Sequence, residues 1–213
     1  MKMKVVGLLA AVMLIVSGCS IGVSMEKQLS DTLTKMNDIE STYRSAQSKL
    51  TELEQTEQKT FTETMELTKE DVDQLRSKVD ELKKLNEERL ANLDEEESAI
   101  NEAKTHIKEL EGIKDKASES EKKSIDELTD TVSQRYELHA VFINEYKKLT
   151  SIQKEFYDML PKEDVQLDEL KNKVEEVNTQ NEVVKEAITK FNESTKKVNE
   201  VKDNVFKSLK KDE

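Results

Sequence analysis

Apolar residues recur on alternating three- and four-residue steps through residues 69–117, where the pattern is most regular. Nine of the twelve positions on this stripe are apolar: Val72, Leu75, Val79, Leu82, Leu93, Ile100, Ala103, Ile107 and Leu110. This spacing predicts a long helix with one apolar face. The three exceptions are Asn86, Arg89 and Glu96. We call this stripe, along which the helix packs against its neighbours, the seam. Polar residues on a seam usually set the register of packing or the choice of partner helix.

The same spacing predicts three further helices, at about 25–66, 120–160 and 163–211. In the first of these, the apolar positions shift by one residue after Leu53, to Phe61 and Met65, so its second half is the least regular segment. After residue 22 the chain has one glycine, Gly112, and one proline, Pro161. These are too few for a β-rich or loop-rich fold, so the chain is expected to be nearly all helix.

Three positions predict where the chain turns. Thr68 is followed three residues later by Asp71, and Ser118 by Glu121. The second pair has the residue types of a capping box. Pro161 disfavours helical geometry at the residue before it and suits the first turn of a new helix. A break between helices is therefore expected at each position.

Four long segments joined by short turns predict an all-α fold, an elongated up-and-down four-helix bundle with coiled-coil-like packing. The alternative is an extended coiled-coil dimer, whose continuous seam would have to run through Pro161 and the Ser118 box. We favour the bundle. Its topology places the N-terminus, the turn near 112–120 and the C-terminus at one end, and the turns near 66–70 and 160–164 at the other.

The N-terminus has the features of a secretory signal peptide. Lys2 and Lys4 precede an apolar run from Val5 to Val16. At about twelve residues this run is shorter than the roughly twenty needed to span a bilayer. The next residues complete the sequence Val16-Ser17-Gly18-Cys19, which resembles the lipobox that signal peptidase recognises in bacterial lipoproteins.

The lipobox resemblance implies that Cys19 is lipidated with a diacylglyceryl group and becomes the new N-terminus. Cys19 is the chain's single cysteine, so it has no disulfide partner within the chain. We therefore expect a cleaved signal peptide at 1–18, a lipidated N-terminus and short tether at 19–24, and a helical bundle at 25–213. Membrane lipid is the first expected partner, and the expected location is the outer face of the cytoplasmic membrane.

The net charge of the mature chain limits which other partners are possible. Cleavage removes two of the 34 basic residues and no acids, which leaves 32 basic and 46 acidic residues and a formal charge of −14. Such a surface repels nucleic acid and anionic lipid headgroups, and no basic patch stands out. Nucleic acid is therefore excluded as a partner.

No catalytic or metal-binding motif stands out. The two histidines, His106 and His139, fall on different predicted helices, and the Glu-x-x-His pairs of di-iron bundles are missing. His139 lies on the apolar seam and is expected to be a core or register residue. The acidic run at 94–97 points around more than one helical face and cannot converge as a calcium loop does. We expect no catalytic residue, no metal and no cofactor.

Residues around the third predicted turn resemble the YkyA-like family of Gram-positive lipoproteins. They are Tyr146, Leu149, Glu155-Phe156-Tyr157 and Leu160, followed by an acidic turn and Leu167-x-x-Leu170. The resemblance extends over the whole chain in lipobox, length and helical layout. It implies a cell-wall-binding lipoprotein of the Gram-positive envelope with an all-helical domain, and it transfers no functional residue except Cys19.

Three functions follow as hypotheses. The first is a non-enzymatic envelope protein that binds a wall component or an exported protein, or acts as a spacer. The second is a helical accessory subunit of an envelope transport or wall-synthesis complex. The third is an enzyme, which would need a buried carboxylate pair in a cleft.

A candidate partner contact lies at the end expected to be farthest from the membrane. It comprises Phe156, Tyr157, Met159 and Pro161, because aromatic and apolar side chains that are exposed beside a turn, as Tyr157 is expected to be, are plausible anchors. The alternative is that Phe156, Tyr157 and Leu160 only close the end of the core.

Overall fold

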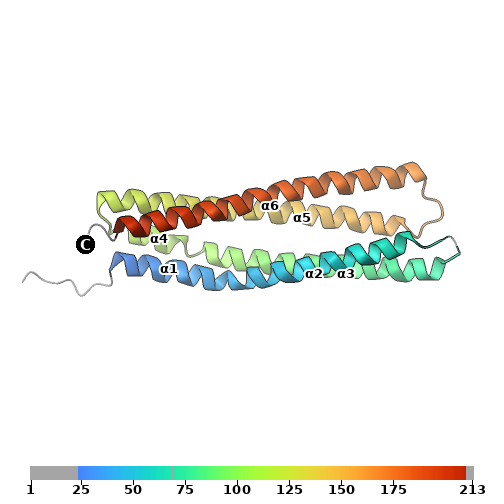
Figure 1. The fold of residues 1–213 in the computed structure, drawn as a ribbon, viewed down its shortest axis with the longest axis horizontal. Coiled ribbons are helices and arrows are strands. Elements are labelled where there is room, and N and C mark those ends of the chain that lie inside the picture. The colour runs from blue at the N-terminus through green and yellow to red at the C-terminus, as the bar shows by residue number, and fades with distance from the viewer. Residues whose placement is uncertain (1–23, 69, 210–213) are drawn as a thin grey trace, which may run out of the picture.

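The structure, a computed structural model, describes residues 24–68 and 70–209 and is all-α. Four long arms run up and down in an elongated bundle (Figure 1). No strand occurs among these residues. The helices are α1 (Met25–Ile39), α2 (Ser41–Met65), α3 (Val72–Lys104), α4 (Ile107–Lys114), α5 (Glu119–Met159) and α6 (Leu167–Leu209). The predicted fold class is confirmed.

Two of the four arms are broken, which the sequence pattern did not predict. The first arm breaks at Glu40, between α1 and α2, and the second at Thr105 and His106, between α3 and α4. At the second break the Thr105 hydroxyl donates to the carbonyl of Glu102 at 2.7 Å, and the backbone N–H of His106 bonds the carbonyl of Ala103. Threonine thus competes for a backbone carbonyl and tightens the turn.

The buried face of the first arm stays in phase along α2, so the predicted one-residue shift is wrong at Met65, although Phe61 is half-buried against the core. Positions Leu50 and Leu53 are followed on the same face by Glu57, Thr60 and Thr64, all buried. Met65, by contrast, is 59% exposed. The seam continues through polar residues, which a search for apolar spacing does not detect.

The turns lie close to the predicted positions, with two differences. The Ser118 capping box forms, with the Ser118 N–H donating to Glu121 Oε2 at 2.7 Å. The Thr68 hydroxyl and N–H both donate to Asp71 Oδ2, but they close the turn itself, because α3 begins only at Val72. The last of the four predicted helices corresponds to α6, which begins at Leu167 and not at 163. Pro161 therefore lies in the turn after α5.

The bundle is built from two hairpins. The closest interfaces lie within the pairs α2–α3 and α5–α6, and α3 against α5 joins the pairs. By comparison, α2 and α6 make little backbone contact. The N-terminal end of α1, the α4–α5 turn and the C-terminal end of α6 lie together, and the α2–α3 and α5–α6 turns lie at the opposite end (Figure 1). This matches the predicted topology.

Buried side chains form three apolar clusters along the bundle, centred on Leu29 and Ile125, on Leu93 and Phe142, and on Leu82 and Phe156. In the described part of the chain, no helix is long and apolar enough to cross a membrane.

Candidate functional site: polar clusters and a cleft between α2 and α6

A buried polar cluster centres on Arg89 of α3, a residue that is 2% exposed. The guanidinium forms an ion pair with Glu57 of α2 and donates to Gln153 Oε1 at 2.9 Å and to the Tyr146 hydroxyl. Tyr157 of α5 donates to the other Glu57 oxygen, Oε1, at 2.6 Å. We call these five residues, with Glu54, the distal cluster. The charge pair joins α2 to α3, and the hydrogen bonds to Tyr146, Gln153 and Tyr157 tie α5 to both.

Electrostatics keeps Arg89 charged and the Tyr146 and Tyr157 hydroxyls protonated near neutral pH. Burial lowers the pKa of Arg89, but its partners Tyr146 and Glu57 outweigh this and hold the pKa above its usual value. Burial raises the pKa of Tyr146 and of Tyr157, and the neighbouring carboxylates Glu54 and Glu57 raise it further. Both hydroxyls therefore remain protonated donors.

Above the distal cluster a cleft of about 290 Å³ opens between α2 and α6. We call it the distal cleft. Its volume lies just below the range of about 300–1,000 Å³ typical of small-molecule sites. Its walls are Glu54, Glu57, Gln58 and Phe61 of α2, Val174, Val177, Asn178 and Asn181 of α6, and its floor is Arg89, Gln153, Phe156 and Tyr157.

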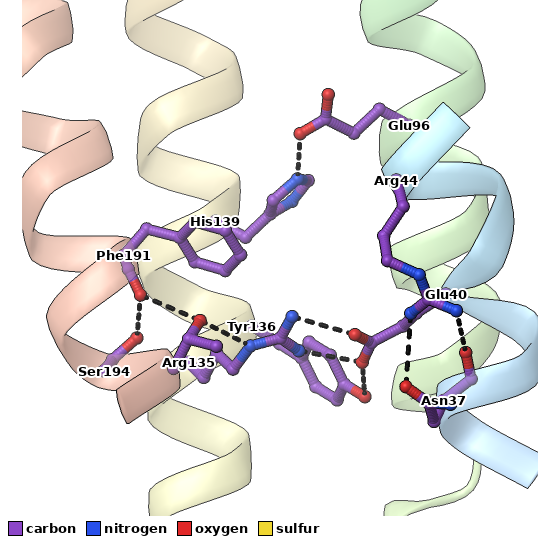
Figure 2. Close-up of polar contacts among 10 residues, drawn as sticks. Asn37, Glu40, Arg44, Glu96, Arg135, Tyr136, His139, Phe191 and Ser194 are labelled. Atoms are coloured by element: carbon purple, nitrogen blue, oxygen red, sulfur yellow. Dashed lines mark hydrogen bonds and ion pairs between the residues drawn. The ribbon is translucent and has the colours of Figure 1, made fainter. Parts of the chain in front are cut away.

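A second cluster, nearer the N-terminal end, centres on Arg135 of α5 (Figure 2). The two terminal nitrogens of Arg135 donate to the two oxygens of Glu40 at 2.8 Å each, and Arg135 Nε donates to Thr195 Oγ1 at 2.9 Å. Tyr136 also donates to Glu40, at 2.7 Å, and the guanidinium lies over the Phe191 ring. This two-pronged pairing uses the residue at which the first arm breaks, so the α1–α2 break positions Glu40.

Between the two clusters, His139 of α5 and Glu96 of α3 form a fully buried pair, with Nε2 and Oε1 2.7 Å apart (Figure 2). Gln47 donates to the other Glu96 oxygen at 2.6 Å. The His139 ring packs edge-on against Tyr43 and Phe191. His139 is thus a core residue, as its seam position indicated.

His106 lies away from this pair, at the α3–α4 break, where its Nδ1 is 2.7 Å from Glu109. Among the residues that the structure describes, no group of three or more His, Cys, Asp or Glu side chains is arranged to hold a metal ion.

Comparison with known proteins identifies the protein family. The YkyA family, described as "Putative cell-wall binding lipoprotein", matches residues 24–208. The chain belongs to this family. It is 29% identical over 211 residues to the "Uncharacterized lipoprotein YkyA" of Bacillus subtilis (strain 168), covering 94% of this chain and 90% of that one. Membership in a lipoprotein family implies a membrane-anchored, extracytoplasmic location.

A solved structure supports the fold. The crystal structure of a conserved protein of unknown function from Staphylococcus aureus aligns with a TM-score of 0.73 at 22% identity, covering 86% of this chain and 96% of that chain. Neither the YkyA family's description nor these relatives' names indicate an enzymatic activity.

The structure separates the four predicted contact residues. Phe156 and Tyr157 are buried, 6% and 4% exposed, and form part of the floor of the distal cleft. Met159 and Pro161 are half-buried and lie outside the cleft. The premise that Tyr157 is exposed is therefore wrong, and closure of the core describes these aromatics better. A partner contact at this end stays a prediction. Cys19 and the lipobox residues Val16, Ser17 and Gly18 lie outside the described residues.

The carboxylates of the distal cleft suit binding better than proton transfer. Glu57 is the buried one, and both of its oxygens are already engaged by Arg89 and Tyr157. Glu54 is exposed and accepts a hydrogen bond from Tyr146. A general acid needs a proton poised for transfer to substrate, whereas Glu57 is held as the partner of a permanent cation.

Sequence reasoning missed most of the distal cleft, although one signal was present. Arg89 was noted as a polar seam position, and Glu57 falls four residues after Leu53, on the same face. Opposite charges at seam positions of neighbouring helices predict a buried pair. Asn178 and Asn181, on the α6 wall of the cleft, show no comparable charge pattern in the sequence.

Proposed function

We propose that this protein is a non-enzymatic wall-binding lipoprotein, anchored through lipid on Cys19 to the outer face of the cytoplasmic membrane of a Gram-positive cell. In this proposal the signal peptide at 1–18 is removed and the bundle holds the distal cleft out toward the wall. The observation that carries the proposal is the position of that cleft on a long, internally tied bundle.

The length of α6 gives the distance between the distal cleft and the other end of the bundle. Asn178 lies 31 residues before Leu209 along a single helix, which corresponds to about 45 Å at 1.5 Å per residue. Because α1 begins at the same end of the bundle as α6 finishes (Figure 1), the cleft lies about that far from the end of the bundle at which the chain enters α1. A tether of about five residues adds at most about 18 Å.

Charge restricts the kind of wall contact. With a formal charge of −14 after cleavage, taken from 32 basic and 46 acidic residues, the domain repels anionic wall polymers at long range. Binding must therefore depend on local contacts to an uncharged part of the wall. The distal cleft offers such contacts through amide and aromatic side chains.

Co-sedimentation tests the proposal. The mature lipoprotein in detergent is mixed with purified wall sacculi, either intact or stripped of anionic polymers, and pelleted. We expect the protein to pellet with both and more with the stripped sacculi. Asn178→Tyr, which fills the cleft, should abolish pelleting, whereas Asn172→Tyr, on an exposed position of the same helix that does not line the cleft, should not. Wild-type protein that stays in the supernatant would sink the proposal.

A further inference from the structure

The lining of the distal cleft differs from the rest of the surface. The chain is 38% charged, yet the α6 wall of the cleft carries Val174, Val177, Asn178 and Asn181 and no charge. The run 178–181 reads Asn-Thr-Gln-Asn. An uncharged amide stretch on an otherwise Glu- and Lys-rich helix points to a specific ligand chemistry.

The amides at the rim are free to bind. Gln58, Asn178 and Asn181 are exposed, and within the described residues their side chains make no hydrogen bond to protein. Gln153, which also lines the cleft, accepts from Arg89 through its oxygen, and its NH₂ group makes no hydrogen bond within the described residues. The amides of Gln58, Asn178 and Asn181 each offer both donors and an acceptor, and Gln153 offers donors. Such groups match hydroxyl and acetamido groups, which also donate and accept.

One wall of the cleft provides an apolar face. Phe61 is half-buried and lines the cleft. Its ring centre lies 5.9 Å from that of Phe156 and 6.5 Å from that of Tyr157. A small set of rings beside a few convergent polar groups is the usual composition of a small-ligand site. The apolar face of a sugar ring can lie against Phe61 while its polar edge meets the amides.

Charge balance selects against ionic ligands. Among the described residues that line the cleft, Arg89 is the only cation, and it is paired with Glu57, whereas Glu54 adds one unbalanced negative charge. A phosphate or carboxylate would find no free cation and would be repelled by Glu54. A cation would meet a Glu54 carboxylate that already accepts from Tyr146. An uncharged ligand incurs neither cost.

We infer that the distal cleft binds an uncharged saccharide bearing acetamido groups, with a ring face on Phe61 and its polar groups on Gln58, Asn178 and Asn181. This inference rests on the proposed wall-binding function and names the wall component as glycan. The volume of about 290 Å³ limits the buried part to one or two sugar rings.

Saturation-transfer NMR and calorimetry on the mature lipoprotein in detergent test the inference. The probe is tri-N-acetylchitotriose, compared with cellotriose, which lacks acetamido groups, and with poly(glycerol phosphate), which is anionic. We expect saturation of the acetamido methyl groups, weaker binding of cellotriose and none of the anionic polymer. Asn178→Ala and Asn181→Ala should each weaken binding about fivefold, the loss expected for one hydrogen bond. Asn192→Ala, an exposed position of α6 outside the cleft, should leave binding unchanged.

The outcomes separate this inference from the proposed function. Equal binding of cellotriose would overturn the acetamido assignment, and binding of poly(glycerol phosphate) would overturn the uncharged class. If no saccharide binds but the protein still pellets with sacculi, the inference fails and wall binding stands. If neither occurs, both fail. Saccharide binding that the Asn178 and Asn181 variants do not weaken would overturn the site.

Discussion

Replacing Arg89 with methionine should destabilise the fold sharply, because it leaves Glu57 buried without its cation. Glu57 is 4% exposed, and its remaining partner is the Tyr157 hydroxyl. Removing one member of a buried ion pair typically costs about 3–5 kcal/mol. The substitution also removes the donors to Tyr146 and Gln153. For a domain of this size, that loss corresponds to a fall in Tm of roughly 6–20 °C.

The assay is urea unfolding followed by circular dichroism, with a matched control on the same helix. Arg76 is exposed on α3, so Arg76→Met should change the unfolding free energy by no more than about 0.5 kcal/mol. Glu57→Gln completes a double-mutant cycle. The Arg89→Met/Glu57→Gln variant should be more stable than the sum of the single losses predicts, by about 0.5–3 kcal/mol. Strictly additive losses, or an Arg89→Met variant within about 1 kcal/mol of wild type, would refute the reasoning.

Three further predictions concern the tyrosines, the lipid anchor and Met159. All four tyrosines have raised pKa values, that of Tyr43 reaching about 12, mainly through burial. Because the folded state holds these protons more tightly than the unfolded state, the tyrosines contribute fully to the unfolding free energy below pH 10. This contribution is lost as pH rises toward 12 and above. The 295 nm absorbance, which has no tryptophan contribution here, should therefore stay flat near pH 10 while the protein is folded and rise only at higher pH. A rise near pH 10 without unfolding would contradict this. Cys19→Ala should abolish membrane retention in detergent phase partitioning, since the apolar run before it is too short to anchor; a processed alanine variant that still partitions with lipid would refute the anchor. Met159→Ser should leave the melting temperature nearly unchanged, and if the half-buried Met159 and Pro161 contact a partner it should reduce crosslinking in cells; undiminished crosslinks would exclude Met159.

The fold could be predicted because it depends on a repeated pattern. Apolar spacing gave the four arms, and the Ser118 box gave the start of α5 within a residue. The breaks could not be predicted in this way. Glu40 lies next to Ile39 in an unremarkable helical stretch, and its partners Arg135 and Tyr136 are 95 and 96 residues away. A break stabilised by long-range contacts leaves little trace in local spacing.

The candidate site was predictable only in part, for a related reason. Arg89 and Glu96 were visible as polar residues on a seam, but their partners Glu57 and His139 are identified only once the helices are paired. The distal cleft depends on how far α2 and α6 stand apart, and this separation follows from the packing of both hairpins along α3 and α5. Helical periodicity carries no information about that distance.

Photocrosslinking from position 178 in living cells tests most directly whether the distal cleft meets the wall. A photoreactive residue replaces Asn178 in one strain and Asn172, on the outer face of the same helix, in another. After irradiation, position 178 should yield adducts with glycan strands that a wall-degrading enzyme releases, and position 172 should yield few or none. Equal glycan adducts from both positions, or adducts from position 178 with proteins alone, would contradict binding of the wall by the distal cleft.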